Sequence, residues 1–323
     1  MKRVPNLPTL GEPLVFGRLA DARVVLVAGA GGGFDVYAGL PLALALVARG
    51  KAVHFANLSF TYLGGTTAPV VAPHLYRVEP DAEGEDAYFP ERALARWLAG
   101  RGLPGVVWGI EKVGVRPVRA AYRHLVAALG VDAIVLCDGG TDILMRGDEA
   151  GLGTPHEDMT SLAAVAGTDV ATRVVMCLGF GVDTFHGVCH AQFLENVAAL
   201  ERDGAYLGAF SVPRGTAEGA AFLEAVAAAQ AMHPRRPSIV AGSIGAAIAG
   251  EFGDVRFTER TAGSELFVNP LMGLYFAFDL MGVAKRSLYL DRLEGTQTVW
   301  AVGHVIDRFR SEVVPRPWKE IPH

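Results

Sequence analysis

The sequence predicts an α/β protein in which helices cover both faces of a doubly wound, mainly parallel sheet. Two observations lead to this fold class. Short continuous apolar runs recur along the chain, as expected for strands that are buried on both faces. Segments with helical periodicity separate these runs, and such alternation is typical of βαβ units with right-handed crossovers.

The first apolar run, residues 24–28, leads into a loop with four glycines, residues 29–33, followed by Phe34 and Asp35. Glycines let backbone N–H groups approach a ligand, and the start of the next helix adds a positive dipole. We therefore expect an anion such as phosphate to bind there, with a cofactor contacting Gly29, Gly31, Gly32, Gly33 and Asp35. Pro41 predicts that the following helix is kinked or begins near Leu40.

The remaining elements follow in order. Strands are expected at residues 51–57, 105–110, 132–137, 173–178, 206–212 and 238–241, and helices at residues 90–101, 115–129, 155–166, 184–200 and 216–232. Thr154, Pro155 and Glu157 match a capping box at the start of the third of these helices. We expect one continuous domain, with a core of residues 1–254 and a C-terminal segment, residues 255–323, packed on it. This aromatic-rich segment is expected to cap the site or to form the contact of a homo-oligomer.

Composition excludes several classes of function. The chain of 323 residues is 51% hydrophobic, carries a net charge of −5 and has no basic run, which argues against nucleic-acid binding. No apolar run approaches the about 20 residues that span a bilayer, and residues 1–13 lack the apolar core of a signal peptide. The odd number of cysteines, without a CxxC pair, fits reduced thiols. We therefore expect a cytoplasmic protein that does not enter the membrane.

A group of acidic residues follows the expected strand at residues 132–137. Its sequence is Asp138-Gly139-Gly140-Thr141-Asp142, and Gly147-Asp148-Glu149 comes shortly after. Carboxylates at the end of a buried strand suit hard divalent cations, so the candidate metal ligands are Asp138, Asp142, Asp148 and Glu149. Such carboxylates also suit sugar hydroxyls or general-base catalysis, and Gly139 and Gly140 join the candidate cofactor contacts. The capping box accounts for Glu157, whereas Asp158 has no such explanation.

Two histidines form the third group of candidates. Positions 186, 190, 193, 197 and 200 share one face of the expected helix, and the first two are His186 and His190. These side chains could serve acid–base catalysis, bind zinc, or lie hydrogen-bonded in the core. Asp183 is expected to cap the helix or to contact the ligand. Arg214 and Asn269 are lesser candidates for which a structural role is favoured.

The glycine loop departs from the nicotinamide dinucleotide fingerprint at two points. The pattern G-x-G-x-x-G requires a glycine where Phe34 stands, and the second strand ends in Asn57 where a ribose-binding carboxylate is expected. Asn57 stays a candidate cofactor contact, but both departures disfavour NAD(P).

Three stretches together resemble the domain-of-unknown-function family 1152: Gly31-Gly32-Gly33-Phe34-Asp35, Asp138-Gly139-Gly140-Thr141-Asp142 and the residues from Gly147-Asp148-Glu149 to Thr154-Pro155-His156-Glu157-Asp158. The resemblance extends over nearly the whole chain. It implies a Rossmann-like α/β fold and no particular activity.

The candidate residues themselves favour an enzyme that hydrolyses or transfers a group on a phosphorylated or nucleotide-like small molecule. Asp138 and Asp142 would hold a divalent cation, Mg²⁺ or Zn²⁺, or a sugar, and His186 or His190 would act as acid or base. Two alternatives stay open. One is an NAD(P)-dependent oxidoreductase that uses the same loop, and the other is a non-catalytic ligand-binding or scaffold protein.

Overall fold

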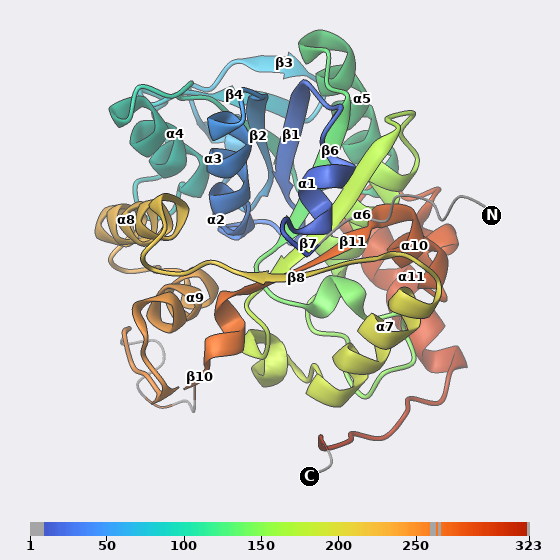
Figure 1. Cartoon of the computed structure of the whole chain (residues 1–323). Coiled ribbons are helices and arrows are strands. Elements are labelled where there is room, and N and C mark those ends of the chain that lie inside the picture. Colours follow the sequence, from blue (N-terminus) through green and yellow to red (C-terminus); the bar gives the residue numbers. More distant parts are fainter. Residues whose placement is uncertain (1–9, 259–262, 264–265, 322–323) are drawn as a thin grey trace, which may run out of the picture.

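A nine-stranded sheet forms the centre of the molecule in a computed structural model that describes residues 10–258, 263 and 266–321 (Figure 1). The spatial order of its strands is β3-β4-β5-β2-β1-β6-β7-β11-β8. The strands are β1 (Val24–Gly29), β2 (Ala52–Ser59), β3 (Val70–Ala72), β4 (Leu75–Val78), β5 (Val107–Glu111), β6 (Ala133–Asp138), β7 (Thr172–Leu178), β8 (Tyr206–Ser211) and β11 (Leu274–Asp279). The predicted doubly wound α/β fold is confirmed.

Five central strands, β5-β2-β1-β6-β7, are parallel, and the strands at both margins are antiparallel to their neighbours. From β1 the chain first builds the sheet toward β2 and β5, and then returns to add β6 on the other side of β1. The strand order therefore reverses between β1 and β6. Open α/β sheets bind their ligands outside the carboxyl ends of the strands at such a point.

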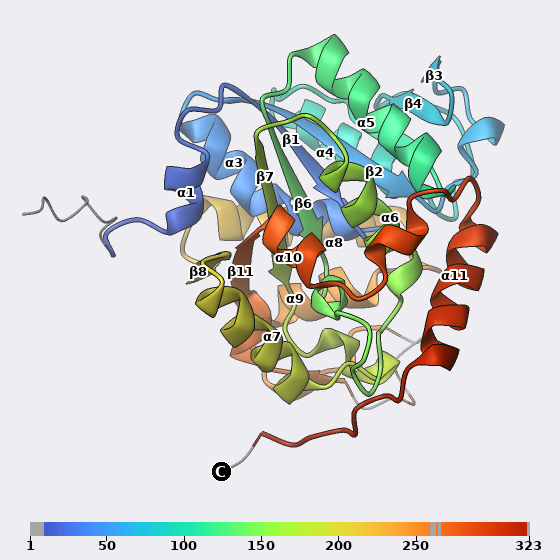
Figure 2. The same ribbon diagram turned by 90° about the vertical axis from the view of Figure 1, so that its right-hand side faces the viewer.

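Helices cover both faces of the sheet (Figure 2). One face carries α2 (Asp35–Ala38), α3 (Leu40–Ala48), α4 (Pro90–Gly100), α8 (Ala217–Met232) and α9 (Ile239–Ala249). The other carries α5 (Val115–Leu129), α6 (Pro155–Ala166), α7 (His190–Arg202), α10 (Leu280–Arg286) and α11 (Val299–Glu312). Successive side chains of β1 alternate between the two resulting cores: Val25 and Val27 pack on the first, Leu26 and Ala28 on the second.

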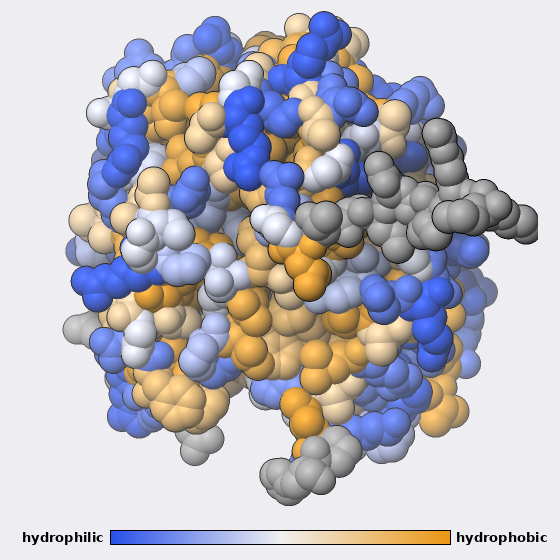
Figure 3. Space-filling view, in the orientation of Figure 1, coloured by the Kyte–Doolittle hydropathy of each residue, from blue (hydrophilic) through white to orange (hydrophobic). Residues whose placement is uncertain are grey.

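Shorter elements connect these layers. They are α1 (Leu14–Arg18), which contacts β8, the 3-10 helices η1 (Leu63–Gly65), η2 (Asp142–Leu144), η3 (Val182–His186), η5 (Pro270–Gly273) and η6 (Leu290–Leu293), and the two-stranded pair β9 (Gly253–Asp254) and β10 (Phe267–Val268). Apolar residues gather around the middle of the face shown in Figure 3, where the sheet margin β8 lies, and polar residues surround them. No helix in the described part of the chain is long and apolar enough to cross a membrane.

Two expected elements differ from the structure. Residues 238–241 are not a strand: the Ser238 hydroxyl accepts a hydrogen bond from the Ala241 N–H and caps α9. The helix expected at residues 184–200 is interrupted, because Gly187 with a φ of 85° ends η3 and α7 begins only at His190. The expected start of α3 at Leu40 is confirmed.

The segment after residue 254 contributes β11, which hydrogen-bonds to β7 on one side and β8 on the other. The Tyr275 hydroxyl of β11 also donates to the Ala38 carbonyl at the end of α2. The boundary at residue 254 stays a prediction. Residues 1–9 of the expected core and part of the C-terminal segment, residues 259–262, 264–265 and 322–323, lie outside the described residues.

Candidate functional site

A cavity of about 750 Å³ opens at the carboxyl ends of the parallel strands, where the order of the sheet reverses. Its wall is strongly acidic: six carboxylates line it, namely Asp35, Asp138, Asp142, Glu157, Asp158 and Asp183. Lys112, His156, His186 and Arg236 are the basic side chains among its described lining residues. The cavity therefore suits a cation, or a ligand that arrives with one.

Three of these carboxylates lie close enough to share one ion. Asp35 is the first residue of α2, Asp138 the last of β6, and Asp158 lies in the first turn of α6. One oxygen of each lies within 4.8 Å of the others. Asp138 and Asp158 are 2% and 1% exposed, and Asp158 Oδ1 has no hydrogen-bond partner among the described residues. A buried, unpartnered carboxylate oxygen is costly unless a proton or an ion completes it.

Burial and mutual repulsion raise the pKa of this group. Burial raises the pKa of Asp35 to about 8, and neighbouring Asp142 and Glu157 add to the shift. Burial likewise raises the pKa of Asp138 and of Asp158 well above its ordinary value, with further contributions from the charges around them. Without an ion the cluster is therefore protonated in part at neutral pH.

The glycine loop gives these carboxylates room. A Cβ atom on Gly31 would lie 2.6 Å from Asp35 Oδ2 and 2.9 Å from Asp158 Oδ1, and one on Gly139 would lie 2.8 Å from Asp35 Oδ1. A Cβ on Gly140, which has a φ of 158°, would lie 2.5 Å from Asp183 Oδ2. The carboxylate side chains therefore leave no room for a larger residue at these three positions.

The same loop has few N–H groups left for a phosphate. The Ala30 N–H donates to the Cys137 carbonyl (2.9 Å), Gly31 to Asp35 Oδ2 (2.7 Å) and Gly33 to the Leu58 carbonyl (3.2 Å). In addition, α2 is only four residues long, so its dipole is small. This geometry does not favour direct binding of a phosphate by the loop, and it weakens the dinucleotide alternative further.

Two residues of the expected capping box have tertiary partners instead. The Thr154 hydroxyl and N–H both donate to Asp142, at 3.1 and 2.7 Å, and no side chain caps α6. Glu157 forms an ion pair with Lys112, which follows β5. The capping-box prediction was therefore wrong, because long-range partners on other loops outcompete the local pattern. Glu157 and Lys112 are site residues that the sequence interpretation missed.

The structure separates the two histidines. His186 lines the cavity at the end of η3. The His190 ring stacks on Phe180 and its Nε2 lies 2.8 Å from Thr184 Oγ1, and it does not line the cavity. The predicted shared helical face was wrong, since the chain turns at Gly187 between them. Asp183 is placed on the cavity wall and accepts a hydrogen bond from the Thr141 N–H at 2.6 Å.

Asp148 and Glu149 do not join the cluster. Asp148 pairs with Arg146 and Arg316, while Glu149 accepts the Arg146 and Gly147 N–H groups and the amide of Asn196. Neither lines the cavity. Their expected role as ligands of the same metal ion as Asp138 is contradicted by these positions, because the nearby arginines and amides already engage them.

Asn57 hydrogen-bonds to the glycine loop from outside the cavity. Its Nδ2 donates to the Gly33 carbonyl (2.8 Å) and to Glu91 Oε1 (2.7 Å), and Glu91 is fully buried. Asn57 lies outside the cavity lining, and a Cβ on Gly29 would come within 2.3 Å of its Oδ1. It therefore positions the loop. Asn269 caps η5 through the Leu271 N–H, a structural role of the kind favoured for it.

Comparison with known proteins agrees with the resemblance noted above. The model of the family described as "Protein of unknown function (DUF1152)" matches residues 87–310, which is more than half of the chain. No curated protein and no solved structure matches the chain. The matched range includes Asp138 and Asp158 and begins after the glycine loop and Asp35.

Proposed function

We propose that this chain, which belongs to the DUF1152 family, is an enzyme that binds a divalent cation with Asp35, Asp138 and Asp158. The proposed enzyme hydrolyses or transfers a group on a phosphorylated or nucleotide-like small molecule. One observation carries the proposal. Three carboxylates from different elements converge where the strand order reverses, and one of them, Asp158, has a buried oxygen without a partner.

A divalent cation fits this donor set. Placing three carboxylates together, two of them buried and Asp35 partly exposed, is unfavourable unless protons or a cation offset their charge. Oxygen ligands favour Mg²⁺ or Mn²⁺, whereas zinc sites usually include nitrogen or sulfur ligands. With His190 directed to Thr184 and Phe180, the histidine pair expected for zinc is not at this cluster. Magnesium is therefore the favoured ion.

The charge of the wall supports a phosphorylated ligand that binds together with the cation. Magnesium held by a few carboxylates keeps positions for waters and for substrate phosphates, and it polarises the phosphoryl group when bound. An anion approaching six carboxylates without a cation would be repelled. Lys112 and Arg236 on the wall supply positive charge, and His186 is the candidate acid or base that faces the cavity.

Calorimetric and thermal-unfolding titrations of the chelator-treated protein with MgCl₂, MnCl₂ and ZnCl₂ test the cation site. We expect MgCl₂ or MnCl₂ at about 100 times its Kd to stabilise the native protein by about 2.7 kcal/mol, which raises Tm by several degrees. Asp158→Asn should fold normally by circular dichroism and lose this response. The matched control Asp148→Asn should keep it, since Asp148 lies outside the cavity.

An equal response in the wild type and in Asp158→Asn would contradict the proposed ligand set, and so would the absence of any response in the wild type. The enzymatic part is tested by cation-dependent release of phosphate from a panel of phosphorylated compounds. Activity that is independent of both the cation and Asp158 would refute it. A protein that binds no cation and no ligand of the panel would favour the scaffold alternative.

A further inference from the structure

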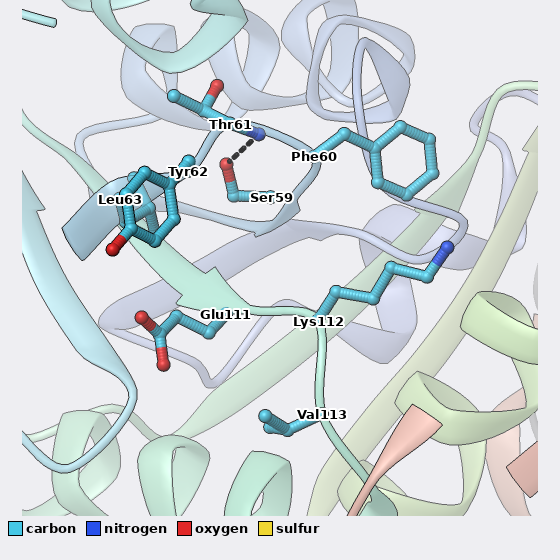
Figure 4. Close-up of a pocket in the computed structure, with 8 residues that line it drawn as sticks. All are labelled: Ser59, Phe60, Thr61, Tyr62, Leu63, Glu111, Lys112 and Val113. Carbon is cyan, nitrogen blue, oxygen red and sulfur yellow. Dashed lines mark hydrogen bonds between the residues drawn. The ribbon is translucent and has the colours of Figure 1, made fainter. Parts of the chain in front are cut away.

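A second hollow, of about 400 Å³, shares two lining residues with the acidic cavity, and Figure 4 shows the residues that line it. It lies between the loop after β2, residues 59–63, and the chain that follows β5, residues 111–113. Phe60 and Lys112 line both hollows, so the two adjoin at these residues. Its volume is within the range of small-molecule pockets, about 300–1,000 Å³. We call it the side pocket.

Two exposed aromatic rings stand at the side pocket. Tyr62 is 78% exposed and Phe60 is 48% exposed, although both are large side chains that usually pack inside. Each ring packs closely against a glycine. A Cβ atom at Gly65 would lie 2.7 Å from the Tyr62 ring, and one at Gly32 would lie 2.8 Å from the Phe60 ring. Each ring thus packs against a glycine and stays partly exposed, and the more exposed Tyr62 ring suits stacking against a planar ligand.

A fixed carboxylate completes the side pocket. Glu111 Oε1 accepts the Tyr76 hydroxyl at 2.9 Å, and its Oε2 lies 2.7 Å from His74 Nδ1. His74 has a φ of 62°, the one positive φ of a non-glycine residue in the described part of the chain. Two neighbours therefore hold the Glu111 carboxylate in place while it stays partly exposed. Its remaining lone pairs suit the hydroxyls of a sugar or the amino group of a base.

Lys112 lies at the junction of the two hollows. Its ammonium group pairs with Glu157 of the acidic cavity and lies 4.9 Å from the centre of the Phe60 ring (Figure 4). A ligand that extends from one hollow to the other passes this positive charge. The junction thus suits the anionic part of such a ligand.

We infer that the ligand is a nucleotide whose base and ribose occupy the side pocket and whose phosphates extend past Lys112 toward Asp35, Asp138 and Asp158. The base stacks on Tyr62, and Glu111, on the same side of the hollow (Figure 4), accepts the ribose hydroxyls or a base amino group. The inference rests on the proposed function, because the phosphate end depends on the cation site. It adds the class of substrate and the place of its ring.

Titration calorimetry of the full chain at saturating MgCl₂ tests the side pocket with ATP, GTP, CTP, UTP and inorganic tripolyphosphate. We expect at least one nucleotide to bind about tenfold more tightly than tripolyphosphate, or by about 1.4 kcal/mol, because its base stacks on an aromatic ring. Tyr62→Ala should weaken nucleotide binding about tenfold and leave tripolyphosphate binding unchanged, and Tyr62→Phe should restore nucleotide affinity. Trp300→Ala is the matched control, because Trp300 is also 78% exposed and lines neither hollow.

Equal affinities for nucleotides and tripolyphosphate would overturn the inference and leave the proposed function standing. The same holds if Tyr62→Ala weakens both ligands equally, or if Mg²⁺ binds but no nucleotide does. A protein that binds neither Mg²⁺ nor any phosphate compound would overturn the proposed function and, with it, this inference.

Discussion

Replacing Asp35 with asparagine should stabilise the metal-free protein at neutral pH while destroying its response to a cation. Asparagine keeps an oxygen that can accept the Gly31 N–H but carries no charge. In the wild type, burial raises the pKa of Asp35 from 3.8 to about 8. Between these values the folded protein holds a proton that the unfolded chain releases, so the free energy of unfolding falls as pH rises.

The size of this effect follows from the shift. Each pH unit between the two pKa values costs about 1.4 kcal/mol of stability per group, or about 3 kcal/mol from about pH 5 to about pH 7. Asp35→Asn removes this loss for one group of the cluster. Saturating MgCl₂ should reverse the order, because the ion binds the deprotonated cluster of the wild type and not that of the variant.

Urea unfolding of both proteins at about pH 5, pH 6 and pH 7, with EDTA and then with MgCl₂, measures these free energies. The control is Asp21→Asn, an exposed aspartate before the amino end of β1 that should follow the wild type in every condition. A wild-type stability that is constant or rises over this interval with EDTA would refute the reasoning. A pH profile of Asp35→Asn parallel to that of the wild type would refute it as well.

Three further substitutions have distinct expected outcomes. Gly31→Ala places a Cβ 2.6 Å from Asp35 Oδ2 and should abolish the MgCl₂-induced rise in Tm, whereas Gly17→Ala, with open space around its Cβ, should retain it. Lys112→Met should weaken tripolyphosphate binding about threefold in calorimetry, because a partly exposed charge contributes up to about 1 kcal/mol, and unchanged binding would remove Lys112 from the anion path. His186→Gln should lower kcat about 100-fold or more with an unchanged Kd for Mg²⁺, while an unaltered kcat would exclude it as the acid or base.

The central parallel strands could be predicted because burial on both faces leaves a continuous apolar run, as in β1 and β6. The margins of the sheet could not. β3 and β4 are short, and β11 lies between β7 and β8, a position that depends on pairing between segments far apart in the sequence. Residues 238–241 have β-branched side chains typical of a strand, but the Ser238 cap and packing against the sheet make them the first turn of α9.

For the site, position at a strand end was an informative signal. Asp35 and Asp138 were identified because they follow β1 and β6, and these strands are neighbours in the sheet. Closeness in sequence was misleading in contrast. Asp148 is only six residues beyond Asp142, yet it forms ion pairs with Arg146 and Arg316 and does not line the cavity. Asp158 joins the cluster through the packing of α6, which a single sequence does not reveal.

The position of β11 brings a late part of the chain into contact with an element of the site. β8 ends at Ser211 and β11 begins only at Leu274, so a growing chain must leave the edge of β7 without its partner until then. When β11 enters, its Tyr275 hydroxyl bonds to the Ala38 carbonyl of α2, the helix whose first residue is Asp35. The helix that begins with Asp35, the proposed cation ligand, thus gains this contact only after β11 has been synthesised.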